Sequence, residues 1–275
     1  MITSSANPTV RQIRALRQRK ERERTGLFFI EGVRLVGEAV QLGADVQALV
    51  VAAELLASPF ARDLVDQQAA AGAQIIEVSA EVFAGLSQKD GPQGLAAVAR
   101  QRWTPLSNVR LGQPPGWVAL VDSADPGNLG TILRTADAVG AAGLILLGAT
   151  TDPYDPAALR ASMGAIFAVQ LARASFDEFA AWKRSSAAFL VGASDKAPVD
   201  YQDVAYPQPL VLLMGSERQG LSPAQQALCD QLVSLPMRGR SDSLNLAVAT
   251  GVLLYELLSQ DRRADSPSRK KTYKQ

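Results

Sequence analysis

The sequence contains no histidine among its 275 residues. This absence removes the commonest general base and metal ligand, and it excludes every serine–histidine or cysteine–histidine nucleophile pair. Cys229 is the single cysteine, so an internal disulfide is impossible and a cysteine-based metal site is not expected. Any chemistry must therefore depend on Arg, Lys, Asp, Glu, Ser, Asn, Tyr or the backbone.

Long apolar segments are also missing. Uncharged apolar stretches such as the one from Ser243 to Tyr255 are too short for a membrane-spanning helix, which needs about 20 residues. The N-terminus is polar and then basic, without the apolar core of a signal peptide. Hydrophobic residues still make up 47% of the chain, enough for a sizeable core. We expect a cytoplasmic protein of one large or two smaller domains, with no membrane partner.

Charge is distributed unevenly, although the net charge is only +1. Residues 1–30 carry seven Lys or Arg and two acids, and residues 262–275 carry six and one. The remaining residues carry fifteen basic and twenty-four acidic side chains. Basic ends on an acidic body indicate contact with a polyanion, although charged ends can also serve solubility alone.

The first hundred residues predict a small α/β unit. Pro8–Thr25 reads as one basic helix capped by Asn7. Apolar strand patterns then alternate with helical patterns over roughly residues 25–100, which predicts a mainly parallel sheet. Residues 101–116 hold three prolines and two glycines without periodicity and read as a linker.

The second half repeats the alternation with longer apolar strands, WVALVD, GLILLG, AFLVGAS, PLVLLMGSE and LVSLPM. Such runs are typical of parallel strands buried on both faces. A final helix is expected from about Ser243 to Gln260, with Ser243 as its N-cap and Asn245 inside its first turn. Its apolar residues cover most of its circumference, which predicts burial or an interface.

Three of these strand ends lead into glycine-rich or polar turns: VDSADPGNLG, LLMGSERQGLS and LPMRGRSDSLN. The ends of parallel strands meet at one edge of a sheet, where ligands usually bind. The first turn lacks the third glycine of a dinucleotide fingerprint and the lysine of a P-loop. Taken singly, each turn also has a plain reading: a solvated Arg134, a strand-to-helix connection at Gly215, and an N-cap at Ser243.

Taken together, DPGNLGTILRTA, LLMGSERQGLS and LPMRGRSDSLNLAVATGVLLYE resemble the three motifs of the SpoU (TrmH-like) RNA 2′-O-ribose methyltransferases of the SPOUT superfamily. The match covers about residues 115–260, in order and spacing. ASMGAIF (Ala161–Phe167) resembles the segment between the family's first two motifs. The basic helix and FFIEG resemble the small RNA-binding domain of many members. The resemblance implies an RNA substrate-binding domain over 1–100, the linker 101–116, a methyltransferase domain over 117–261 and a basic tail over 262–275.

The resemblance further implies an α/β fold, with a SPOUT-type parallel sheet, helices on both faces and a deep trefoil knot. It implies a homodimer with the site near the dimer interface. The cofactor would be S-adenosylmethionine, held in a bent shape largely by backbone groups, with no metal. The positions expected to touch it or lie alongside are Met214, Gly215, Leu235, Pro236, Met237, Ser243 and Leu244.

The same resemblance assigns the catalytic roles. Arg134 is expected to contact the ribose 2′-hydroxyl and its phosphate, and Asn128 to orient Arg134 or the RNA backbone. Glu217 and Asn245 are expected to position Arg134 and the substrate, with Ser243 beside them. The residues expected to bind RNA phosphates are Arg11, Arg14, Arg17, Lys20 and Arg24.

Ribosomal RNA of the 23S type is the favoured substrate, including the class of modification that protects ribosomes from thiostrepton-like antibiotics. Transfer RNA remains open. Two other readings are a non-catalytic RNA-binding protein and a nicotinamide dehydrogenase. The dehydrogenase would use Asp152, about twenty residues after the first turn, to bind a ribose.

Overall fold

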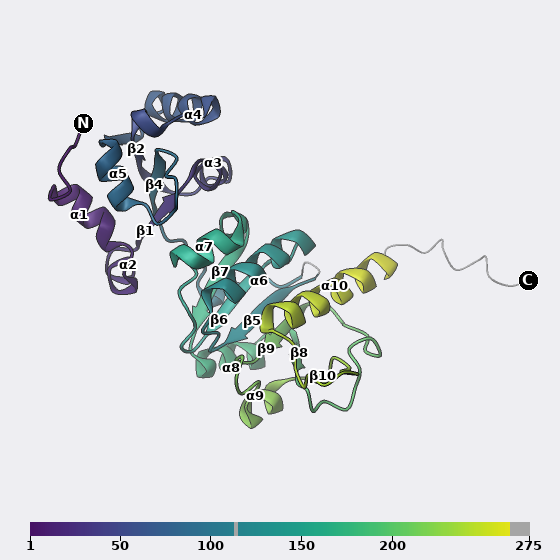
Figure 1. The fold of residues 1–275 in the computed structure, drawn as a ribbon. Helices are drawn as coiled ribbons and strands as arrows, with labels where there is room; N and C mark the ends of the chain where they lie inside the picture. The colour runs from purple at the N-terminus through teal and green to yellow at the C-terminus, as the bar shows by residue number, and fades with distance from the viewer. Residues whose placement is uncertain (113–114, 265–275) are drawn as a thin grey trace, which may run out of the picture. The chain divides into compact units, whose positions relative to one another are not determined.

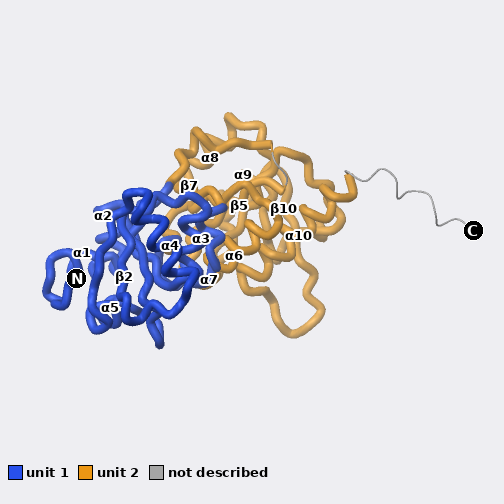
Figure 2. Tube along the Cα trace, turned by 90° about the horizontal axis from the view of Figure 1, so that it is seen from above, with its two compact units in different colours: residues 1–102, 152–168 blue, residues 103–151, 169–275 orange. Residues whose placement is uncertain are grey.

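The computed structural model describes residues 1–112 and 115–264. The chain forms two compact units, shown in Figure 2: unit 1 consists of residues 1–102 and 152–168, and unit 2 of residues 103–151 and those from 169 onward. The division expected from sequence differs at one segment, because residues 152–168 were assigned to the methyltransferase domain. In the structure they pack with the N-terminal residues, so unit 1 is built from two stretches of chain.

Unit 1 contains a four-stranded sheet in the order β1-β4-β2-β3 (Figure 1). Its strands are β1 (Leu27–Glu31), β2 (Val46–Val51), β3 (Gln74–Glu77) and β4 (Leu95–Arg100), and its helices α3 (Val33–Gln41), α4 (Pro59–Ala70) and α5 (Ala80–Leu86) lie between them in the chain. The expectation of a mainly parallel sheet is wrong here, since β4 lies antiparallel between β1 and β2. Only the pair β2–β3 is parallel and adjacent.

The basic N-terminal segment forms two helices, α1 (Pro8–Ala15) and α2 (Arg19–Thr25), where one was predicted. Asn7 caps α1 as expected, because its Oδ1 accepts from Thr9 N at 2.9 Å. The break is explained by Arg22, whose side chain is 1% exposed. Its guanidinium donates to the carbonyls of Leu16 and Arg17 at 3.0 and 2.8 Å, which satisfies backbone acceptors at the end of α1.

Arg22 also holds the segment 152–168 within unit 1. Its Nε lies 2.6 Å from Asp152 Oδ2, and both side chains are buried. Tyr154 adds an aromatic contact with Phe28, with ring centroids 4.5 Å apart. The segment continues through α7 (Pro156–Ser162). The acid that a dehydrogenase would need for its ribose is therefore already engaged by an arginine.

Unit 2 contains a six-stranded sheet in the order β10-β8-β9-β5-β6-β7. Its strands are β5 (Trp117–Val121), β6 (Gly143–Leu147), β7 (Gln170–Ala174), β8 (Phe189–Ala193), β9 (Leu210–Met214) and β10 (Gln231–Val233). Every adjacent pair is parallel, as predicted, and β5, β6 and β9 are buried along their whole length. Strand β7 was not predicted, because QLARA lacks a continuous apolar run.

Helices cover both faces of this sheet (Figure 1). Helices α6 (Pro126–Val139) and α10 (Leu246–Ala264) pack together, and α8 (Phe176–Ser185) contributes Phe179 to the core with Trp117 and Ala119. The stretch predicted as a linker is part of this packing, since Leu106 and Leu111 lie against the same core. Within the described residues, no helix is both long and apolar enough to cross a membrane.

Candidate functional site

The turns after β5 and β9 begin side by side, because these strands are neighbours and Leu120 pairs with Met214. The third turn starts after β10, which is two strands away from β9 in the sheet. It leads into α10, and α10 packs on α6, the helix that follows the first turn. Three segments far apart in sequence thus reach the carboxyl edge of one parallel sheet, where α/β proteins usually place their ligands.

Glu217 joins the first two turns. Its Oε1 accepts from Ser123 Oγ at 3.1 Å and from Asn128 Nδ2 at 3.3 Å. Its Oε2 accepts from the backbone N of Ala124 at 3.3 Å. Asn245 adds the third turn, because its Nδ2 donates to Asn128 Oδ1 at 2.9 Å. Asn128, Glu217 and Asn245, all nominated from sequence, therefore form one hydrogen-bonded cluster.

The environment of Glu217 favours its charged form. Partial burial acts to raise the pKa of its carboxyl, but hydrogen bonds from the backbone of Glu217 and Ala124 and from the side chains of Asn128 and Ser123 outweigh it. The pKa of Glu217 lies below its ordinary value of 4.5 as a result. At neutral pH Glu217 is an acceptor that fixes the amide orientation of Asn128.

Asn245 also caps helix α10, a role that the sequence predicted for Ser243. Helix α10 begins at Leu246, and Asn245 Oδ1 accepts from the backbone N of Ala247 at 2.9 Å and of Val248 at 3.3 Å. Asn245 is therefore the N-cap, and the predicted cap Ser243 instead donates to Asp242 Oδ1 at 3.2 Å. Capping consumes the amide oxygen of Asn245 and directs its amide nitrogen toward Asn128.

Arg134 stands apart from this cluster. Its side chain is exposed, and it makes no hydrogen bond or ion pair with any other residue in the described part of the chain. The expected orientation of Arg134 by Asn128 is not present, since Asn128 bonds Glu217 and Asn245 instead. The six residues from Asn128 to Arg134 span about 1.7 helical turns, so the two side chains leave α6 on different sides.

The residues expected beside S-adenosylmethionine fall into two groups. Met214 and Gly215 are buried at the end of β9, and a Cβ on Gly215 would lie 2.1 Å from the carbonyl carbon of Gly220. Glycine is thus required at 215 because the turn folds back on itself, not only for ligand access. Leu235 is half-buried, and the other group members are exposed: Pro236, Met237, Ser243 and Leu244.

The loop 235–244 has the chemistry that this cofactor needs. Within the described chain, its backbone N–H and C=O groups make no backbone hydrogen bonds. Met237 and Leu244 expose apolar surface beside them, at 38% and 41%. Unpaired main-chain polar groups next to apolar side chains fit an adenine ring and a methionine backbone, which combine flat apolar faces with polar edges. Described residues contain no cluster of three or more metal-ligating side chains.

Sequence reasoning missed three polar residues in the first turn. Ser123 is fully buried on Glu217, and Asp122 adopts φ 47° while its Oδ1 accepts from Ala149 N at 2.7 Å. Asp125 caps α6 by accepting from Asn128 N at 2.7 Å. Asp followed by Pro126 is a cap signal that could have been read. A non-glycine residue at positive φ has no such signal and often marks a functional turn.

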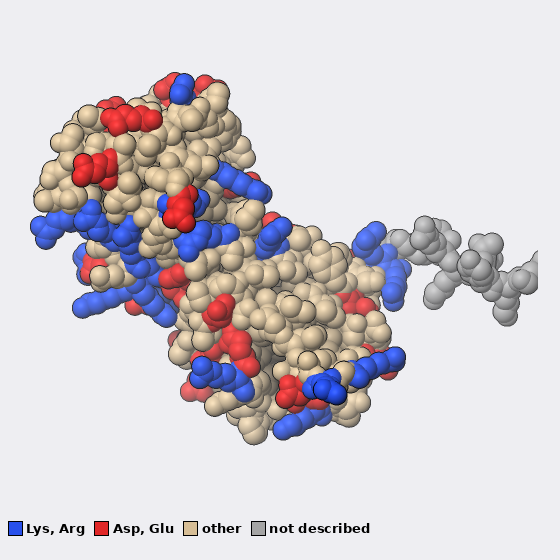
Figure 3. Space-filling view, in the orientation of Figure 1, with Lys and Arg blue, Asp and Glu red and all other residues tan. Residues whose placement is uncertain are grey.

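The predicted RNA-binding side chains lie on α1, α2 and the turn between them, in unit 1. Figure 3 shows basic side chains gathered over these helices. Arg11 and Lys20 are exposed, Arg14 is half-buried, and Arg24 pairs with Glu21 at 2.8 Å. Arg17 donates to the carbonyls of Gly85 and Ser87 at 3.0 and 3.1 Å. Most of the predicted basic tail, residues 265–275, lies outside the described residues.

Two family models match the chain. The SpoU rRNA Methylase family model matches residues 116–255, and the MRM3-like substrate binding domain model matches residues 7–97. The chain is 34% identical over 265 residues to the 23S rRNA (uridine(2479)-2'-O)-methyltransferase of Streptomyces viridochromogenes, covering 94% of this chain and 91% of that protein. It is 29% identical over 257 residues to the 23S rRNA (guanosine(2553)-2'-O)-methyltransferase RlmP of Bacillus subtilis, covering 93% and 98%.

Solved structures agree with these matches. The crystal structure of an AdoMet-bound rRNA methyltransferase from Sinorhizobium meliloti superposes with a TM-score of 0.86 at 39% identity, covering 96% of this chain and 97% of that one. The SpoU methyltransferase AviRb from Streptomyces viridochromogenes, in complex with AdoMet, gives 0.84 at 32% identity and covers 93% and 98%. Both similarities extend over nearly the whole chain, including unit 1.

Proposed function

The chain belongs to the SpoU rRNA methylase family, and from this premise we propose that it transfers a methyl group from S-adenosylmethionine to a ribose 2′-hydroxyl of ribosomal RNA. The observation that carries the proposal is the joining of three distant strand-end turns through Asn128, Glu217 and Asn245. Relatives that act on 23S rRNA favour that substrate over transfer RNA. The nicotinamide dehydrogenase reading is wrong, because the family differs and Asp152 is bound to Arg22.

The cofactor is assigned to the backbone of Met214–Gly215 and the loop 235–244. S-adenosylmethionine, when bound, supplies a methyl group attached to a positively charged sulfur. The unpaired main-chain groups of the loop would hold its polar edges, and Met237 and Leu244 would cover its apolar faces. The similar AdoMet-bound structures support S-adenosylmethionine as the cofactor.

Arg134 is assigned to the acceptor ribose. A ribose hydroxyl is a poor nucleophile until it loses its proton, and the charge that develops on its oxygen needs a fixed partner. A guanidinium remains protonated at every working pH, so it stabilises an alkoxide well and removes a proton poorly. The exposed Arg134, without a partner in the described chain, is available for this oxygen and the adjoining phosphate.

The cluster around Glu217 would position the substrate and leave proton removal to another group. The lowered pKa of Glu217 makes its carboxylate a weak base. A phosphate oxygen of the RNA or a water molecule is the better proton acceptor. Ser243, at the exposed end of the loop, would lie beside both substrates.

A homodimer is part of the proposal. Helices α6 and α10 border an exposed apolar groove lined by Thr131, Thr135, Ala247, Val248, Gly251, Val252 and Tyr255. Val248 and Tyr255 are 52% and 55% exposed there, and large exposed apolar patches usually mark interaction sites. A second copy of the chain would cover this groove. The dimer interface would then lie on the helices that carry Arg134 (α6) and follow Asn245 (α10).

The dimer is tested by replacing Tyr255. Tyr255→Glu places a charge in the groove, so we expect a monomer in light scattering, while Tyr255→Phe should remain a dimer. A wild-type monomer at micromolar concentration would contradict the dimer. The deep trefoil knot stays a prediction based on family membership.

The function is tested by incubating the full chain with labelled S-adenosylmethionine and separated ribosomal and transfer RNA lacking the modification. We expect label in 23S rRNA, at a single nucleotide resistant to alkaline cleavage on its 3′ side. Label found only in transfer RNA would show that transfer RNA, and not ribosomal RNA, is the substrate. Binding of RNA without transfer to any fraction would favour the non-catalytic alternative.

A further inference from the structure

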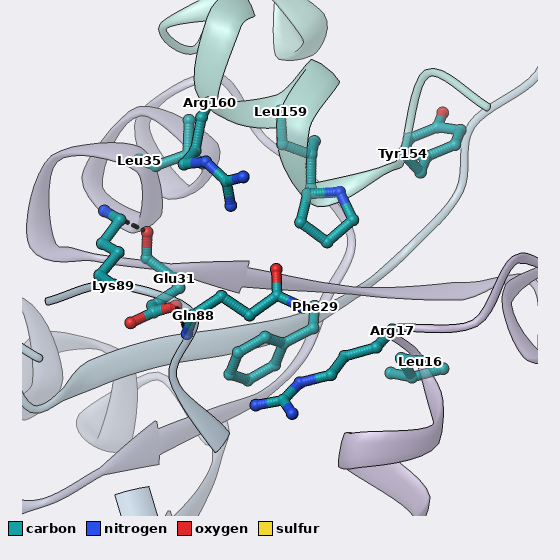
Figure 4. Close-up of a pocket in the computed structure, with 11 residues that line it drawn as sticks. Leu16, Arg17, Phe29, Glu31, Leu35, Gln88, Lys89, Tyr154, Leu159 and Arg160 are labelled. Atoms are coloured by element: carbon teal, nitrogen blue, oxygen red, sulfur yellow. Dashed lines mark hydrogen bonds between the residues drawn. The ribbon is translucent and has the colours of Figure 1, made fainter. Parts of the chain in front are cut away.

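Unit 1 contains a groove that the proposed reaction does not use. It lies over β1 and is lined by residues of both stretches that form unit 1, 1–102 and 152–168 (Figure 4). Most of its roughly 440 Å³ of empty space is open to solvent, so a ligand would lie across the groove and not inside an enclosed cavity. The lining residues used below are Arg17, Phe29, Glu31, Lys89 and Arg160.

The groove carries an excess of positive charge. Arg17, Lys89 and Arg160 border it, and none forms an ion pair with a carboxylate in the described chain. Arg17 is held by two carbonyl oxygens and Lys89 by the carbonyl of Glu31 at 3.1 Å. The Arg160 side chain is exposed, and it makes no hydrogen bond with another described residue. Three cations without acidic partners, two of them held in place, favour an anionic ligand.

The interior of the groove is not suited to an isolated phosphate. Glu31 points a carboxylate into the wall, where it accepts from Ser87 Oγ and from Gln88 N at 3.0 Å. Each carboxylate oxygen keeps capacity for a further donor. Phe29 packs against the hydrophobic core of unit 1 but stays partly exposed, and it makes no ring contact with another aromatic residue of the described chain. An aromatic face beside a hydrogen-bond acceptor suits a flat ring that carries N–H groups.

We propose that this groove binds one unpaired nucleobase of the substrate RNA, with the base against Phe29 and its flanking phosphates on Arg17 and Arg160. The inference rests on the proposed function, which supplies RNA as the partner. Arg17, in the turn between α1 and α2, also belongs to the predicted RNA-binding set, so the groove shares a residue with the surface expected to bind phosphates. Proteins commonly read single-stranded RNA by stacking splayed bases on aromatic side chains.

The proposal is tested on the full chain with a short single-stranded RNA carrying one 2-aminopurine, and with the duplex of the same sequence. Stacking quenches 2-aminopurine fluorescence. Phe29→Leu keeps an apolar side chain but removes the ring, so we expect the quenching to disappear and single-strand affinity to fall about tenfold. Arg160→Ala should weaken single-strand binding and reduce its salt dependence. Duplex affinity should change little in both variants.

Phe60→Leu and Arg184→Ala are the matched controls. Phe60 is 47% exposed on α4 outside the groove, and Arg184 is exposed on α8 in unit 2. Both should bind and quench like the wild type. Wild-type quenching and affinity in Phe29→Leu would overturn the proposal. If thermal unfolding shows that Phe29→Leu does not fold, unchanged single-strand affinity of Arg160→Ala overturns it alone.

Methyl transfer is measured in parallel to separate the two proposals. If the wild-type chain quenches the probe but methylates no RNA, the proposed function fails and the groove assignment stands. If it methylates ribosomal RNA while both groove variants bind like the wild type, the groove assignment fails alone.

Discussion

Glu217 shows how much one side chain can organise at the residue scale. Its two oxygens accept from Ser123, Ala124 and Asn128, and a fixed Asn128 then receives Asn245. Arg134 is the complementary case, a charge that the described chain leaves without a partner. Glu217 therefore fixes the structure around the site, whereas Arg134 is available to a substrate.

Replacing Arg134 tests the chemical step. Arg134→Ala should lower turnover about 100- to 1,000-fold, because a fixed donor to developing oxyanion charge is lost. S-adenosylmethionine affinity should be unchanged, since the residues assigned to it lie on other segments. Labelled methyl transfer and equilibrium binding give the two values, with Arg160→Ala as an arginine control for cofactor binding. Loss of cofactor affinity with turnover retained would refute the assignment.

Replacing Glu217 tests its charge. A folded-state pKa below 4.5 means that folding favours the carboxylate. Its contribution to stability is therefore present above the unfolded pKa and is lost as the pH falls through the lower folded value. Glu217→Gln should unfold at a lower temperature than the wild type at pH 7, and the difference should shrink below about pH 4.5. Thermal unfolding across this range is the measurement, and a gap that widens in acid would contradict the assignment.

At the scale of elements, the start of α10 combines stability and site geometry. The oxygen of Asn245 caps the helix, and its nitrogen reaches α6 through Asn128. Arg22, within α2, is similar in kind, because its side chain bonds carbonyls at the end of α1 and also fixes a segment 130 residues away. In both places one polar side chain serves two elements.

Two substitutions separate the roles of Asn245. Asn245→Asp keeps the capping oxygen but loses the donor to Asn128, so stability should change little while methyl transfer falls. Asn245→Ala loses both, and the free energy of unfolding should drop by about 1 kcal/mol. Denaturant unfolding and methyl transfer are measured for each. Equal stability loss in the two variants would show that the cap is not what Asn245 contributes.

At the scale of the whole molecule, the charge asymmetry of the sequence acquires a location. The basic residues of the N-terminal stretch lie on α1 and α2 of unit 1, whereas the cluster around Glu217 belongs to unit 2. RNA affinity and methyl transfer should therefore respond to different substitutions.

Salt dependence tests this division. Arg11→Ala combined with Lys20→Ala removes two exposed charges, so the slope of log affinity against log salt should decrease by roughly 1.4 to 1.8. Turnover at saturating RNA should be unchanged. Filter binding over a salt series gives the slope, with Arg184→Ala as a single-charge control. An unaltered slope would place the RNA elsewhere.

The sequence by itself determined the parallel sheet of unit 2, because uninterrupted apolar runs such as WVALVD can be stable only where both faces are buried. It also determined that the turns after these strands carry Asn128, Glu217 and Asn245 as candidate site residues. It predicted one N-terminal helix and a parallel N-terminal sheet, and both were wrong. Local patterns contain neither the buried Arg22 nor the insertion of β4 between two other strands.

Only the tertiary structure decided which partners these side chains have. Asn245 and Asn128 are 117 residues apart, and no periodicity or turn preference relates one to the other. The same holds for Arg22 and Asp152, which bring residues 152–168 into unit 1. Local sequence sets the backbone preference of each element, but hydrogen bonds between distant side chains form only after the sheet has brought their elements together.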